Sequence, residues 1–190
     1  GRANRRGPAG RSAGVSAASE FSLILTLADA AQGRAVAVEA DPEARARVAK
    51  RLGLIAVDHF SLTAEIRSVA GGIGAKGAVR ATIVQSCAAT GLPVPATVDE
   101  PFDLRFLRDI DAPVDAEEEI EISSEDCDLL PLEGDRIDLG EAAVQTLSLA
   151  LDPFPRHPDA DRILAEKGVL SEEAAGPFAA LARLRRKPDG

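Results

Sequence analysis

The chain has 190 residues, of which 45% are hydrophobic and 28% are charged, with 31 acidic against 22 basic side chains. This length suits one globular domain with a tail, and the apolar content is too high for wholesale disorder. No apolar run approaches the roughly 18 residues that a membrane-spanning helix needs, so an integral membrane protein is excluded.

The first 18 residues are mainly Gly, Ala, Ser and Arg, and they offer little that a core could bury. We therefore expect residues 1–18 to form a disordered, Arg-rich tail, followed by a single domain over residues 19–186. No apolar segment of about 7–15 residues follows the arginines, which argues against a secretory signal and favours the cytoplasm.

Alternating side chains over residues 21–27 predict a strand, and a second short strand is predicted over residues 35–39. Asp41 then offers an N-cap acceptor, and Pro42 is favourable at the first helical position. The apolar residues that follow recur at helical spacing and predict a helix over residues 42–52. The outer face of this helix carries Arg45, Arg47, Lys50 and Arg51.

Residues 54–106 alternate apolar and polar side chains between glycine-rich turns. This pattern predicts an antiparallel meander of strands. The segment Gly-Gly-Ile-Gly at residues 71–74 lacks the spacing and the following helix of a phosphate-binding loop, so no nucleotide site is expected there.

The charge is concentrated in the middle of the chain, because residues 91–139 carry 16 acidic and 3 basic side chains. Residues 109–126 are predicted to be an acidic loop, either simply solvated or able to attract a basic partner. The candidate contacts for such a partner are Glu117, Glu118 and Glu119.

Asp138 and Glu141 have the spacing of a capping box at the head of an apolar run, which predicts a helix near residues 140–151. The Pro-rich segment 152–160 follows, and its prolines favour an extended chain that either docks a partner or caps the core. A last helix is predicted near residues 177–185. Together these elements predict an α+β fold in which about three helices flank an antiparallel sheet, left open or partly closed as a barrel.

Few residues suggest a catalytic or metal-binding role. Asp58 and His59 are neighbours on a strand and should face opposite ways, so His59 is expected to be an ordinary strand residue. Cys87, Cys127 and His157 do not stand at metal-ligand spacings from one another or from His59, so no metal is expected. Cys87 is expected to be buried at a strand end, with a thiol role as the alternative. No cofactor and no small-molecule substrate are expected.

Arg-rich segments flank the acidic middle and raise the question of RNA contact. With six Phe and no Trp or Tyr, the chain has few side chains on which bases could stack, so contact would be made mainly to phosphates and would be salt-sensitive. The candidate contacts for RNA or another partner are Arg80, Pro153, Pro155, Arg156, Arg183, Arg185 and Arg186.

Two segments resemble the bacterial YceD family. Residues 84–94 (VQSCAATGLPV) are similar to the family's strand, Cys and Pro-Val turn, and residues 134–156 (GDRIDLGE through DPFPR) are similar to its most recognisable stretch. Residues 177–181 (PFAAL) resemble the ending of alphaproteobacterial members. Many relatives have a second Cys soon after the first; Ala88, Ala89 and Thr90 stand there instead, which weakens a metal-binding role.

The resemblance implies a cytoplasmic factor needed for normal accumulation of precursor and mature large-subunit (23S) ribosomal RNA, and it carries over no catalytic residues. Three hypotheses follow. The first is a non-enzymatic ribosome-assembly factor that contacts ribosomal RNA or an early ribosomal protein. The second is an acidic adaptor that holds a basic ribosomal protein against residues 109–126 without direct RNA contact. The third and least favoured is a small hydrolase that uses His59 or His157.

Overall fold

A computed structural model describes residues 20–109 and 127–169 of the chain. The acidic residues of the predicted loop, the Arg-rich tail and the predicted helix near residues 177–185 therefore lie outside the described residues, apart from Asp109. In the described ranges no helix is both long enough and apolar enough to cross a membrane.

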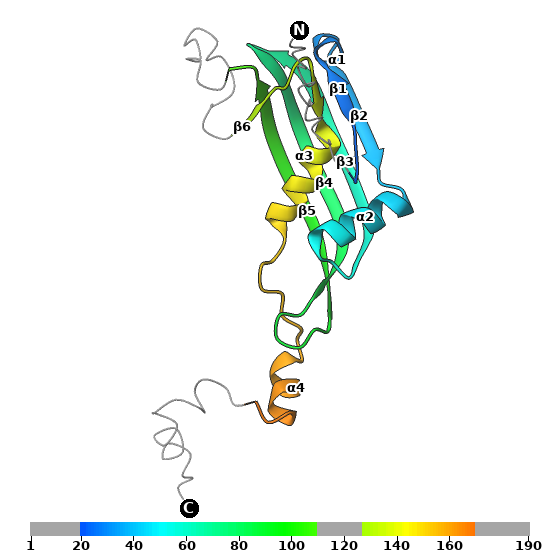
Figure 1. Cartoon of the computed structure of the whole chain (residues 1–190), viewed down its shortest axis with the longest axis vertical. Coiled ribbons are helices and arrows are strands. Elements are labelled where there is room, and N and C mark those ends of the chain that lie inside the picture. The colour runs from blue at the N-terminus through cyan, green and yellow to red at the C-terminus, as the bar shows by residue number, and fades with distance from the viewer. Residues whose placement is uncertain (1–19, 110–126, 170–190) are drawn as a thin grey trace, which may run out of the picture.

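A five-stranded sheet forms the body of the molecule (Figure 1). Its strands, in spatial order, are β2 (Arg34–Glu39), β3 (Ala56–Val69), β4 (Gly72–Ser86), β5 (Pro93–Leu107) and β6 (Asp128–Pro131). The pairs from β2 to β5 are antiparallel, so the predicted meander is confirmed.

The prediction of an antiparallel sheet was wrong at one edge, because β6 runs parallel to β5. Parallel neighbours need a long connection, and residues 108–127 supply one between these two strands. The sheet ends at β2 on one side and at β6 on the other. Within the described ranges no pairing joins these edges, so the partial barrel closure is not found there.

The predicted strand over residues 21–27 is shorter in the structure. Only β1 (Ile24–Thr26) is a strand, paired with β7 (Arg136–Asp138) in a separate two-stranded sheet. The next residue begins α1 (Leu27–Ala31) because the Thr26 side chain accepts the Asp29 N–H while the Asp29 carboxylate accepts the Thr26 N–H. This reciprocal capping box ends the strand at Thr26.

The two longer helices begin and end within one residue of their predicted bounds. In α2 (Pro42–Leu52) the Asp41 carboxylate accepts the Ala44 N–H at 2.7 Å. In α3 (Leu139–Ala150) the Asp138 carboxylate accepts the Glu141 N–H at 3.2 Å. The short helix α4 (Ala160–Glu166) follows the Pro-rich segment and was not predicted.

The core lies between one face of the large sheet and the helices, with α2 and α3 lying across that face in Figure 1. The predicted strand faces are buried: Leu62, Ala64 and Ile66 on β3, Val79, Ala81 and Ile83 on β4, and Phe102, Leu104 and Phe106 on β5. From α3, Val144 and Leu147 are fully buried against them. The ring of Phe60 meets that of Phe21 edge-on, with centroids 5.0 Å apart. The opposite face of the sheet is mainly polar.

Candidate functional site

A Pro-rich segment, residues 152–158, leaves the end of α3 and lies against the end of β4 and the loop after it; we call this segment the strap (Figure 1). The buried side chain of Gln85 donates from Nε2 to the Asp152 carbonyl oxygen at 2.9 Å. The Ala88 N–H donates to the Pro155 carbonyl oxygen at 2.8 Å. Both acceptors are backbone carbonyl oxygens of the strap. Residues 84–94 and 134–156, the two segments that resemble the same family, are therefore in contact in the folded chain.

Cys87 makes a further contact with the strap. Its side chain is buried, which confirms the prediction, and its Sγ accepts the His157 N–H at 3.3 Å. This N–H, assisted by the Thr90 side chain, stabilises the thiolate and lowers the pKa of Cys87 to about 7. The hydrogen bond therefore links the ionisation of Cys87 to the docked position of the strap.

This shift predicts a pH-dependent stability. The folded pKa of about 7 lies below the ordinary thiol value of 9.0. The resulting stabilisation is fully present above the unfolded pKa and is lost as the pH falls through the folded pKa. We expect the free energy of unfolding of the wild type, measured in urea from pH 6 to pH 9, to exceed that of Cys87→Ala by a margin that grows between about pH 7 and pH 9.

The control for this titration is Cys127→Ala, which keeps Cys87 and should keep the pH-dependent margin. A constant difference between the wild type and Cys87→Ala over the whole pH range would contradict the expectation.

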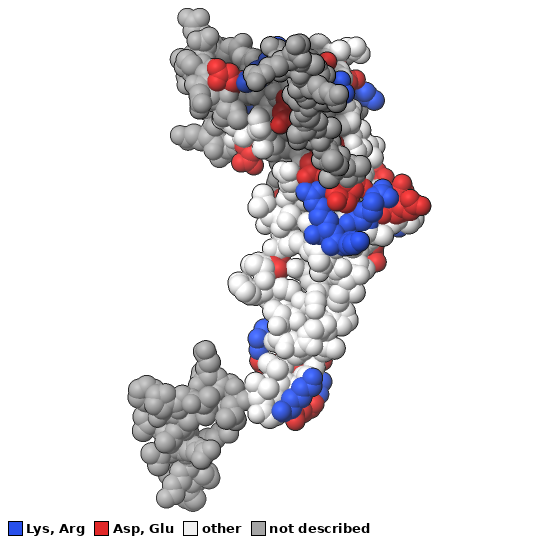
Figure 2. All heavy atoms as spheres, in the orientation of Figure 1, with Lys and Arg blue, Asp and Glu red and all other residues white. Residues whose placement is uncertain are grey.

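Large apolar side chains project from the strap and from the last turn of α3. Leu149 is 88% exposed and Phe154 is 78% exposed. Pro153 between them is also exposed, and we call these three residues the tip surface. Figure 2 shows that the face between the charged side chains of α2 and those of α4 is largely free of Lys, Arg, Asp and Glu. Large apolar side chains with this much exposure are candidates for a protein interaction site.

The predicted contact residues are spread over different surfaces. Arg80 lies on the polar face of the sheet. Its Nε is 3.1 Å from the carboxylate of Asp99, the residue opposite it on β5. Arg156 belongs to the strap and pairs with Asp161. Each arginine is therefore already compensated by a carboxylate, which reduces the positive potential available to a phosphate.

The other predicted contacts divide between the strap and the residues that are not described. Pro153 is exposed, whereas Pro155 is buried and contributes its carbonyl oxygen to the strap anchor. Outside the described residues lie Arg183, Arg185, Arg186, Glu117, Glu118 and Glu119.

The candidate catalytic and metal-binding side chains do not form one site. His59 lies on β3, with Nδ1 3.3 Å from Glu39 and Nε2 3.0 Å from the Ser61 hydroxyl. The His157 ring accepts the Asp159 N–H through Nδ1 at 3.1 Å. Across the described ranges no group of three or more His, Cys, Asp or Glu residues is placed to hold a metal ion.

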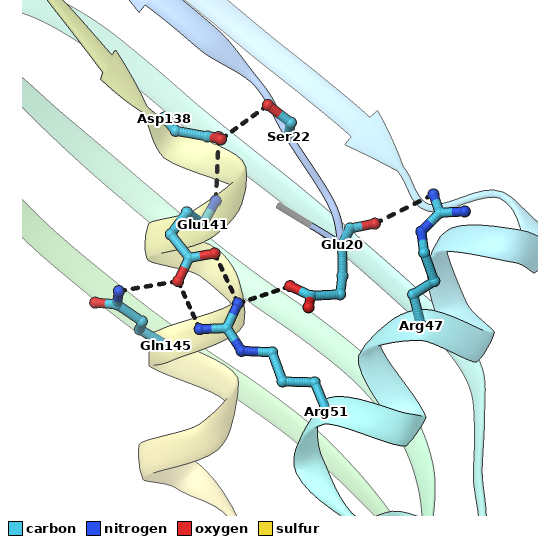
Figure 3. Close-up of polar contacts among 7 residues, drawn as sticks. All are labelled: Glu20, Ser22, Arg47, Arg51, Asp138, Glu141 and Gln145. Atoms are coloured by element: carbon cyan, nitrogen blue, oxygen red, sulfur yellow. Dashed lines mark hydrogen bonds and ion pairs between the residues drawn. The ribbon is translucent and has the colours of Figure 1, made fainter. Parts of the chain in front are cut away.

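An ion network ties α2, α3 and the chain before β1 together (Figure 3). The Arg51 guanidinium donates to both carboxylate oxygens of Glu141, at 2.6 and 2.7 Å, and to Glu20 at 2.8 Å. Arg51 thereby lowers the pKa of Glu20. Asp138, at the start of α3, also accepts the Ser22 hydroxyl at 2.8 Å. These contacts give Arg51 a structural role and fix the helix that carries the strap.

Comparison with known families gives a match over residues 75–185 to the family described as large ribosomal RNA subunit accumulation protein YceD. The matched region includes most of β4, the loop that holds Cys87, α3 and the strap. No curated protein and no solved structure matches the chain.

Proposed function

The chain belongs to the YceD family, and from this premise we propose that it promotes the accumulation of large-subunit (23S) ribosomal RNA as a non-catalytic assembly factor. The family description ties the chain to the accumulation of that RNA. In this proposal the factor works in the cytoplasm by binding a protein component of the growing subunit through its tip surface.

The observation that carries the proposal is the exposure of Leu149 and Phe154 on a braced backbone. Prolines restrict the strap, and the bonds from Gln85 and Ala88 hold it in place before any partner arrives. A preordered segment loses little conformational entropy on binding, and an exposed aromatic side chain is a frequent binding anchor.

The chemistry of the tip surface favours a protein over RNA phosphates at this position. Its side chains are apolar, and the nearby Arg156 is paired with Asp161. A ribosomal protein with an apolar groove would bury Leu149 and Phe154, and this burial would supply the binding free energy.

The absence of catalysis is part of the proposal. Cys87 is buried next to the strap, and the rings of His59 and His157 each have partners that hold them in place. His59 lies on β3, with the Ser61 hydroxyl 3.0 Å from Nε2 and the Glu39 carboxylate 3.3 Å from Nδ1, whereas His157 belongs to the strap. In this proposal the contacts of His59 are structural, and neither histidine has a catalytic step.

The test replaces both apolar anchors, in Leu149→Ser/Phe154→Ser, in cells that lack the native copy. Losing a binding hot spot of about 2 kcal/mol weakens partner affinity roughly 30-fold. We expect precursor and mature 23S RNA, measured against small-subunit RNA, to fall to the level of cells without the protein. Full restoration of 23S RNA by the variant would contradict the proposal.

Three controls sharpen this experiment. Leu129→Ser removes an exposed leucine from β6 and should restore 23S RNA fully. His59→Ala/His157→Ala should also restore it, since the proposal assigns neither ring a catalytic step. A further variant replaces Glu117, Glu118 and Glu119 by Ala. If this variant abolishes accumulation while the tip variant restores it, the adaptor hypothesis replaces the proposal.

A further inference from the structure

A shallow hollow lies between α2 and the start of β3. Arg45 and Lys50 line it together with apolar residues that include Ala46, Leu54 and Ile55. Ile55 is 52% exposed, although it is a large apolar residue. The hollow therefore combines two cations with an accessible apolar surface.

The two cations differ from the other basic residues of α2. Arg51 is held by Glu20 and Glu141, and Arg47 lies 3.6 Å from Glu43. Neither Arg45 nor Lys50 forms an ion pair with any residue in the described ranges, and no acidic side chain is among the residues that line the hollow. Figure 2 shows Lys and Arg side chains over α2 on the helix-covered face, with acidic side chains directly beside some of them. The positive charges of Arg45 and Lys50 are not neutralised by an ion pair within the described ranges.

We infer that this hollow binds the phosphates of single-stranded RNA, so that the chain contacts ribosomal RNA directly at a surface separate from the tip. The inference depends on the family's link to ribosomal RNA, and it does not depend on the tip surface. Arg45 and Lys50 are five positions apart, about 7.5 Å along the helix axis, and their long side chains can reach neighbouring phosphates. The apolar lining suits the sugar or base between those phosphates.

The first described residue is bonded to the same helix. Glu20, the first described residue, is bonded to Arg51 at 2.8 Å and its carbonyl oxygen accepts from Arg47 at 3.4 Å. Two cations set along the hollow suit an extended polyanion better than a single small anion.

The test measures binding of the full-length chain to a fluorescein-labelled, mixed-sequence single-stranded RNA of 20 nucleotides by anisotropy between 50 and 300 mM KCl. In Arg45→Gln/Lys50→Gln we expect about tenfold weaker binding at 100 mM KCl. We also expect the slope of log affinity against log salt to flatten by about 1.4, since each lost phosphate contact removes about 0.7. The charge-retaining swap Arg45→Lys/Lys50→Arg should bind as the wild type does, which separates lost charge from a folding defect.

The matched control is Arg162→Gln/Lys167→Gln, which removes the same charge near α4 and should leave affinity and slope unchanged. The tip variant Leu149→Ser/Phe154→Ser should also keep both values, so failure here is distinct from failure of the proposed function. The inference is overturned if the wild type does not bind the RNA, if the α2 variant keeps its slope, or if the α4 variant loses as much. It is also overturned if a poly-glutamate peptide competes as well as RNA, because the hollow would then be a site for acidic protein.

Discussion

Replacing Gly77 by alanine is expected to lower the free energy of unfolding by about 3 kcal/mol, measured by urea denaturation. A Cβ at this position would lie 1.9 Å from the Thr63 carbonyl oxygen and 2.7 Å from the Ala64 Cα. Both atoms belong to the backbone of β3, which cannot move aside without breaking its pairing with β4. The strain would therefore fall on the two central antiparallel strands of the sheet.

Gly74→Ala on the same strand is the comparison. A Cβ there would lie 2.8 Å from Val69 Cγ1, which is a side-chain atom. A side chain can move by rotation, so we expect a clearly smaller loss of stability for Gly74→Ala than for Gly77→Ala. Equal losses would show that the close backbone approach at Gly77 is not what limits the fold.

The elements that the sequence predicts well are those with a local chemical signal. Asp41 and Pro42 mark the start of α2, and Asp138 marks the start of α3 within one residue. The alternation on β3 to β5 identifies the buried faces, because a strand buries every second residue. At Thr26 two local signals overlap, since the alternating pattern continues past a capping box, and the capping box determines where the strand ends.

The parallel pairing of β6 could not be predicted in the same way. A four-residue strand carries no mark of its direction, which is set by the path of the connection before it. The ion-pair partners of the cations on α2 could not be predicted from the sequence either. Arg51 finds its partners 31 and 90 residues away in the chain, so only the folded structure distinguishes it from Arg45, which has no ion pair among the described residues.

The extended form of the strap could be predicted from the sequence, but the hydrogen bonds that anchor it could not. The prolines predicted an extended segment, but its anchors accept hydrogen bonds through carbonyl oxygens that every residue possesses. The exposure of Leu149 did have a signal. It follows the buried Leu147 by two residues, which is about 200° around a helix, so the two side chains leave opposite sides of α3.

Gly140→Ala is expected to cost about 3 kcal/mol of unfolding free energy, although alanine is the better helix former by 0.5–1 kcal/mol. A Cβ at Gly140 would lie 2.3 Å from the Phe21 carbonyl oxygen and 2.8 Å from the Leu23 nitrogen. To relieve these contacts, the start of α3 must move away from the chain before β1. That movement would stretch the bonds from Asp138 to Ser22 and from Arg51 to Glu141.

Because α3 carries the strap, this variant should lose both stability in urea and 23S RNA accumulation in cells. Gln145→Ala is the matched control on α3. It removes one exposed hydrogen bond to Glu141, at 3.1 Å, and should stay within about 0.5 kcal/mol of the wild type. The tip variant Leu149→Ser/Phe154→Ser, by contrast, should lose RNA accumulation at unchanged stability. Wild-type stability for Gly140→Ala would mean that α3 can shift freely against the chain before β1, and the strap would then lack the fixed base on which docking at the tip depends.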